Sequence, residues 1–84
     1  FENDLMIYPN PANDEIEVSY FVEKEQKIQI DLVDVMGKVI QSKEVKGRGQ
    51  VIKEKFVIKN QSSGQYFINI KSNNRSISKR FYKE

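Results

Sequence analysis

The chain has 84 residues, a net formal charge of +2, and neither histidine nor cysteine. This length suits a single domain that buries roughly 60% of its unfolded surface. Without His and Cys there is no Ser-His-Asp or Cys-His catalytic system, no ordinary zinc site and no disulfide. No apolar run reaches the ~20 residues of a membrane-spanning helix, and no signal peptide is evident. Because the chain starts at Phe1 without an initiator Met, we expect a piece of a longer precursor.

The charges are distributed unevenly. Residues 1–42 carry three lysines against nine acidic residues, whereas residues 43–84 carry eleven basic residues against three acidic ones. Acidic and basic strands that lie side by side neutralise each other across a sheet, which is the interpretation we favour. The alternative is a basic C-terminal surface that meets an acidic partner or anionic lipid headgroups.

The first two elements are predicted strands joined by a proline-rich connector. Residues 5–8 (LMIY) form a short apolar strand that ends at a Pro-Asn-Pro segment, where proline lacks an N–H and restricts the residue before it. A polyproline recognition ligand is an alternative for this segment, but strand signals on both sides favour a stiff connector. Residues 15–21 then alternate, with Ile16, Val18 and Tyr20 on one face.

The middle of the chain continues the period of two. Residues 27–34 place Ile28, Ile30 and Leu32 on one face, and the break in alternation that follows predicts a bulge near Asp34. A tight turn at residues 36–38 needs the positive φ that Gly37 supplies, and residues 39–46 resume as a strand. The loop at residues 46–50 has two glycines but lacks the spacing of a phosphate-binding loop. Residues 50–59 form the next strand.

The last third, residues 64–84, predicts a β-hairpin. Tyr66, Ile68 and Ile70 form the buried face of its first strand, and residues 72–74 (SNN) form the turn. The return strand covers residues 76–82. A terminal strand with an unpaired edge is open to a receptor strand or to a second copy of the chain, so an edge-strand dimer is a further hypothesis.

Seven short strands at regular spacing predict an all-β, seven-stranded, antiparallel immunoglobulin-like β-sandwich. We expect one domain spanning residues 1–84. The predicted core consists of the inward-facing apolar residues Ile16, Val18, Ile28, Ile30, Leu32, Val39, Phe56, Ile58, Tyr66, Ile68, Ile70 and Ile77.

No catalytic or cofactor-binding constellation is found, and we do not expect an enzyme. The carboxylates of Glu15, Glu17, Asp31 and Asp34 are most simply a solvated face, because they fall on alternating strand positions. A glycosidase pair would need a cleft that a sandwich of this length hardly offers. Asn13 and Asp14 could join Asp31 and Asp34 around Ca²⁺, although no loop has dense Asp spacing. A nucleic-acid platform is a further alternative, which would use the basic and aromatic residues Phe67, Lys71, Lys79, Arg80 and Tyr82. The acidic first half argues against nucleic acid.

Four sequence blocks resemble one family. YPNPA at residues 8–12 is similar to the opening signature of the type A C-terminal sorting domains of type IX secretion in Gram-negative bacteria. DVMGKV at residues 34–39, SGQYFI at residues 63–68 and the basic-plus-apolar SKRF at residues 78–81 resemble the next blocks in order. The family usually closes on small aliphatic residues where this chain has Phe81 and Tyr82.

The resemblance implies a seven-stranded immunoglobulin-like domain at the C-terminus of secreted cargo. Such a domain is read by the type IX translocon after passage through the periplasm. A sortase-like cysteine protease then commonly removes it, and the cargo is released or attached to the cell surface at the outer membrane.

From this resemblance and the terminal hairpin we predict the recognition residues Lys79, Arg80, Phe81, Tyr82 and Lys83. The residues assigned to shape are Tyr8, Pro9, Asn10, Pro11, Gly37, Lys38, Gly64 and Tyr66. The alternative function is an immunoglobulin-like accessory module that stays on a secreted enzyme or adhesin and binds carbohydrate or protein. Its candidate aromatic platform is Phe67, Tyr82 and Phe21.

Overall fold

Period-two alternation produces seven strands in a computed structural model that describes residues 4–84. The strands are β1 (Met6–Tyr8), β2 (Glu15–Val22), β3 (Lys27–Asp34), β4 (Val39–Lys46), β5 (Gln50–Val57), β6 (Gly64–Lys71) and β7 (Ser76–Lys83). The predicted bounds of β3 and β4 are confirmed to the residue. The predicted bounds of β1, β2, β5 and β7 each differ from the observed bounds by one or two residues at one end.

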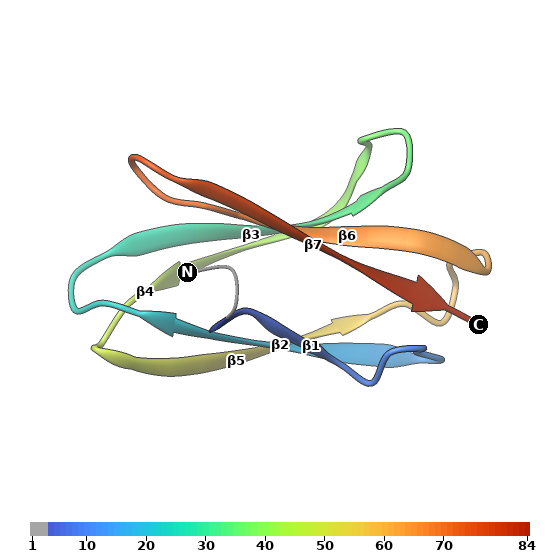
Figure 1. The fold of residues 1–84 in the computed structure, drawn as a ribbon, viewed down its shortest axis with the longest axis horizontal. Coiled ribbons are helices and arrows are strands. Elements are labelled where there is room, and N and C mark those ends of the chain that lie inside the picture. The colour runs from blue at the N-terminus through green and yellow to red at the C-terminus, as the bar shows by residue number, and fades with distance from the viewer. Residues whose placement is uncertain (1–3) are drawn as a thin grey trace.

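The strands form two antiparallel sheets packed face to face (Figure 1). One sheet has the order β1-β2-β5 and the other has the order β4-β3-β6-β7. The chain crosses between the layers after β2, β4 and β5, and β3–β4 and β6–β7 are hairpins. This confirms the prediction of an all-β, immunoglobulin-like sandwich. The edge strands are β1 and β5 in one layer and β4 and β7 in the other.

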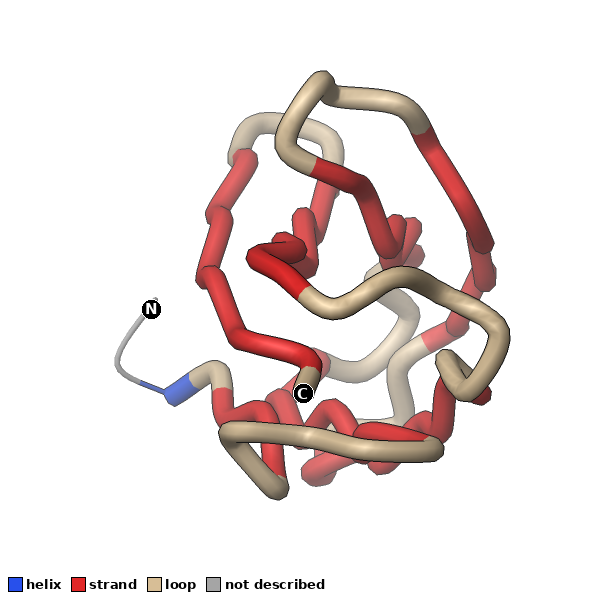
Figure 2. The backbone as a smooth tube through the Cα atoms, turned by 90° about the vertical axis from the view of Figure 1, so that its right-hand side faces the viewer, coloured by secondary structure: helices blue, strands red, loops and turns tan. Residues whose placement is uncertain are grey.

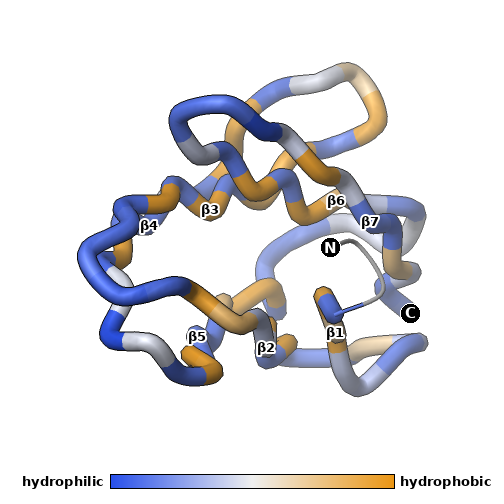
Figure 3. The backbone as a smooth tube through the Cα atoms, turned by 60° about the vertical axis from the view of Figure 1, so that its left-hand side comes forward, coloured by the Kyte–Doolittle hydropathy of each residue, from blue (hydrophilic) through white to orange (hydrophobic). Residues whose placement is uncertain are grey.

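The core lies between the inner faces of the two sheets, and Figure 3 shows the alternation of apolar and polar residues that supplies it. Eleven of the twelve predicted core residues are buried or half-buried there. Val39 was predicted wrongly: it is 49% exposed, because the bulge between Leu32 and Val33 shifts its register on β3. The prediction omitted six buried apolar residues, which are Leu5, Ala12, Tyr20, Val22, Val33 and Phe81.

The β3–β4 turn is fixed by Asp34. Its carboxylate oxygen Oδ1 accepts hydrogen bonds from the backbone N–H groups of Met36 and Lys38, both at 2.9 Å. Its backbone carbonyl accepts the N–H of Gly37, whose φ of 85° explains the glycine at this position. The predicted turn is confirmed. It holds Val35 and Met36 in solvent at the tip.

The loop between β4 and β5 passes close to the loop between β2 and β3. Gly47 donates its N–H to Gln26 O at 2.6 Å, and a Cβ at this position would lie 1.9 Å from Glu23 O. Only glycine fits at position 47, so Gly47 serves the packing of the two loops, whereas Gly49 has a φ of 74°. The sequence showed a loop here but gave no sign of the contact.

Tyr66 anchors the crossover that leads into β6. Its ring is buried in the core, and its hydroxyl donates a hydrogen bond to Ser62 O at 2.6 Å. This back-bond from an early tyrosine of the sixth strand has the geometry of the tyrosine corner of immunoglobulin-like folds. The first residue of the strand, Gly64, has a φ of 146°.

Candidate functional site: the terminal strand and the loop that covers it

The terminal strand β7 is an edge strand paired only with β6. In an antiparallel ladder, alternate residues direct both backbone groups to the same side. Tyr82 and Glu84 bond outward, away from β6, so the even-numbered residues of β7 form its outer edge. The C-terminal end of β7 descends toward the β1-β2-β5 layer, as Figures 1 and 2 show.

The proline-rich loop after β1 covers the last part of this edge. Ala12 donates its N–H to Tyr82 O at 2.8 Å and accepts the Glu84 N–H at 2.8 Å, which makes a short parallel bridge to Lys83. Asn10 Oδ1 accepts the Tyr82 N–H at 3.0 Å. We call residues 82–84, which are the last two residues of β7 and the residue after it, the covered half of the edge. Two sequence motifs at opposite ends of the chain thus form one unit.

The first part of the same edge is open within the described chain. No described residue bonds to the outward backbone groups of Ser76, Ser78 or Arg80, and we call this segment the open half of the edge. It offers three residues to a pairing strand.

Three of the five predicted recognition side chains make contacts with other residues of the domain. Phe81 is buried and stacks on Tyr66, with ring centroids 5.9 Å apart. Lys83 is 8% exposed and its Nζ contacts Glu84 O, while Lys79 Nζ donates to Leu5 O at 2.8 Å. Arg80 is exposed and Tyr82 is 46% exposed. Both lie on the outer face of their sheet beside a hollow of about 220 Å³ that they line with Asn10, Gln65 and Phe81.

The residues assigned to shape occupy turns and anchors around this site. Tyr8 donates its hydroxyl to Glu17 Oε2 at 2.7 Å, which ties β1 to β2, and this hydrogen bond raises the pKa of the Tyr8 phenol. The peptide bonds before Pro9 and Pro11 are both cis. Gly37, Lys38, Gly64 and Tyr66 lie in the β3–β4 turn and the entry to β6 described above.

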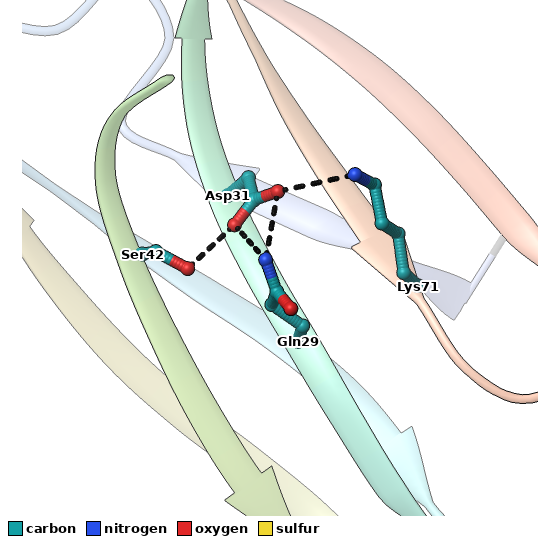
Figure 4. Close-up of polar contacts among 4 residues, drawn as sticks. All are labelled: Gln29, Asp31, Ser42 and Lys71. Atoms are coloured by element: carbon teal, nitrogen blue, oxygen red, sulfur yellow. Dashed lines mark hydrogen bonds and ion pairs between the residues drawn. The ribbon is translucent and has the colours of Figure 1, made fainter.

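Asp31 does not lie on a solvated face, contrary to the sequence interpretation. It points to the outer side of its sheet but is 1% exposed, because neighbouring side chains close over it (Figure 4). Its carboxylate accepts hydrogen bonds from Ser42 Oγ at 2.6 Å and Gln29 Nε2 at 2.9 Å, and Lys71 Nζ lies 3.5 Å away. Burial alone raises the pKa of the Asp31 carboxyl. The hydrogen bonds and the Lys71 charge outweigh burial and leave that pKa below its ordinary value.

The other candidate groups are separated by the fold. Asp14 precedes β2 in one layer, whereas Asp31 and Asp34 lie in the other, and residues 4–84 contain no cluster of three His, Cys, Asp or Glu able to hold a metal ion. Phe67 and Tyr82 share the outer face of the four-stranded sheet, but Phe21 belongs to β2 in the opposite layer. The three aromatics therefore form no row. Within the described range, no helix is long and apolar enough to span a membrane.

The acidic and basic halves of the chain meet across strands. Glu17 of β2 lies opposite Lys55 of β5, and ion pairs join Glu25 to Lys46 at 3.3 Å and Asp31 to Lys71 at 3.5 Å. This arrangement agrees with mutual neutralisation, the interpretation favoured from the sequence.

Fold and site define an immunoglobulin-like sandwich whose opening motif and terminal strand are coupled. The family described as the secretion system C-terminal sorting domain matches residues 6–84. The chain therefore belongs to this family, the C-terminal sorting domains of type IX secretion. No curated protein matches it in sequence. A sorting-signal family is not a catalytic one, and its role implies transit through the periplasm to the outer membrane, the cell surface or the medium.

The sequence did not reveal which residues connect the two ends. Asn10 was assigned to shape, but its side chain also accepts a hydrogen bond from β7. Ala12 was not singled out, although its backbone makes two of the bonds. The only sequence sign was that both motifs occur in one family pattern.

Proposed function

We propose that the type IX translocon reads this sorting signal at the terminal strand, by pairing with the open half of the β7 edge. The observation that supports the proposal is the division of that edge: the Asn10–Ala12 loop occupies its end, and Ser78 and Arg80 remain available. Backbone pairing supplies affinity and is indifferent to sequence. Specificity then falls to the exposed side chains nearby, Arg80 and Tyr82.

A charge at Arg80 guides the encounter without being needed for folding. Arg80 is exposed and makes no ion pair with a described residue, whereas Lys79 bonds to Leu5 O. Arg80→Glu is therefore a cleaner test than a change at Lys79. Lys59→Glu is the matched control, because Lys59 is also exposed and lies in the β5–β6 connection, outside β7.

The test is export of a reporter. A signal peptide and a fluorescent protein are placed before residues 1–84 and expressed in type IX-competent and translocon-deficient cells. We expect export only from competent cells, a marked loss for Arg80→Glu with Tyr82→Ala, and normal export for Lys59→Glu. Wild-type export of the folded double variant would contradict recognition at β7.

We further propose that a sortase-like cysteine protease removes the domain after translocation and that the cargo is released or attached to the cell surface. The mass of the exported reporter tests this. We expect loss of the 9.9 kDa domain, or a mass that shows attachment of a surface group in its place. An intact fusion outside the cells would contradict removal and leave the sorting role standing.

A further inference from the structure

The second edge of interest is that of β5, in the opposite layer. The β2–β5 ladder is continuous from Val22–Gln50 to Glu15–Val57. Every second residue of β5 therefore directs its backbone N–H and C=O groups away from β2 along the whole strand. The carbonyls of Lys55 and Val57 accept bonds from β4 and thus point outward. The odd-numbered residues of β5 therefore form its outer edge.

Side chains from β4 cover the last part of this edge. Gln41 Nε2 donates to Val57 O at 2.6 Å, and Lys43 Nζ donates to Lys55 O. Lys43 also lies 3.6 Å from Glu54 Oε1 and 4.8 Å from the centre of the Phe56 ring. These contacts join β4 to the last part of β5, and they therefore connect the two sheets.

The first part of the edge is open. No described residue bonds to the outward backbone groups of Val51 or Lys53. A groove of about 680 Å³ lies here between β4 and β5, and the half-buried side chains of Val45 and Ile52 line it. The sheet that contains β5 has three strands and the other sheet has four. One more strand, paired with Val51 and Lys53, would give both sheets four strands.

The side chains along β5 define which strand would fit. On the outer face Phe21 lies opposite Val51, and Glu17 lies opposite Lys55, so β5 already has apolar and acidic partners in β2. A strand added antiparallel at the free edge would meet the exposed Lys53 and Val51 on that face and Ile52 on the inner face. Opposite charges and apolar pairs across strands are stabilising, and like charges are not.

We propose that the β4–β5 groove binds an extended peptide segment by strand addition to β5. The segment has an acidic residue opposite Lys53, an aliphatic residue facing inward opposite Ile52, and an apolar residue opposite Val51. A second copy of β5 does not fit this description, because pairing would bring Lys53 and Lys55 of both copies onto one face without an acid. The site is separate from β7 and does not depend on how the translocon reads the domain.

An NMR titration of the isotope-labelled chain tests the site directly. The probe is the acetylated and amidated peptide Thr-Glu-Val-Val-Thr, which presents the stated pattern antiparallel to β5. We expect shifted resonances and slowed exchange at the Val51 and Lys53 amides. The amides of the central strand β3, which is already paired with β4 and β6 on its two sides, are the internal control and should not respond.

A charge swap tests the chemistry. The peptide with Lys in place of Glu should bind the wild-type chain roughly threefold or more weakly, and Lys53→Glu should reverse this preference. Equal binding of the two peptides to the wild-type chain, which needs no variant to fold, would overturn the assignment. So would an equal response at the β3 amides, or shifts at Val51 and Lys53 that grow with protein concentration in the absence of peptide.

Discussion

The edges of β7 and β5 are covered in different ways. At β7, backbone groups of Ala12 make two of the three bonds, and only Asn10 contributes a side chain. At β5, both bonds come from the side chains of Gln41 and Lys43. The covering of β7 therefore depends on the path of the proline-rich loop, whereas the covering of β5 depends on side-chain identity and charge.

One buried phenylalanine anchors each of these two edge strands, Phe81 on β7 and Phe56 on β5, and removing it should have the largest effect. Phe81→Ala leaves a cavity beside Tyr66 and should lower the free energy of unfolding by about 3–5 kcal/mol. Phe56→Ala, the matched change on β5, should cost a similar amount. Urea denaturation measures both. If Phe81→Ala cost less than about 1 kcal/mol, β7 would not be held by its core face.

The loop that leads into β5 should tolerate substitution poorly at Gly47, which is buried against the β2–β3 loop. Gly47→Ala places a Cβ against the Glu23 backbone, and overpacking of this kind costs about 1–3 kcal/mol or more. Arg48→Ala, at the exposed neighbouring position, should change stability by less than about 0.5 kcal/mol. Equal stabilities of the two variants would show that the two loops do not approach each other this closely.

Asp31 lies on β3 and joins both neighbouring strands, β4 through Ser42 and β6 through Lys71. Asp31→Asn should cost about 1–3 kcal/mol at pH 7. Because the folded pKa of Asp31 lies below the unfolded value of about 3.9, its contribution is complete above roughly pH 5 and is lost as the pH falls through the folded pKa. The stability gap between wild type and Asp31→Asn should therefore shrink from pH 5 to pH 2. A constant gap would contradict the lowered pKa.

The smallest effects should separate the two kinds of covering. Asn10→Ala removes one acceptor at β7, and Gln41→Ala removes one donor at β5; each should cost about 0.5–1.5 kcal/mol. The Tyr82 amide should exchange faster in Asn10→Ala, while the Glu84 amide, bonded to Ala12 O, should keep its protection. Loss of protection at both amides would mean that the Asn10 side chain, and not the loop path, holds the covered half of the edge.

Local pattern was enough for the strands and for most of the core. Alternation in residues 15–21, 27–34 and 64–71 identified which side chains face inward, because the period of two is a property of the strand itself. Gly37 identified a turn because only glycine adopts its φ without strain. The resemblance of the motif blocks also predicted the family, and the match of that family to residues 6–84 confirms it.

Only the tertiary structure decided what depends on residues far apart in the chain. Asp31 has the pattern of an exposed residue, yet Ser42 and Lys71 bury it from neighbouring strands. Gly47 is required by a loop more than twenty residues earlier, and Phe81 is buried because its strand turns that face toward Tyr66. Ala12 pairs with the end of β7 across the gap between the sheets. A one-dimensional pattern fixes the face of a residue within its own strand, but the strand's neighbours and the coverage of its edges follow from packing.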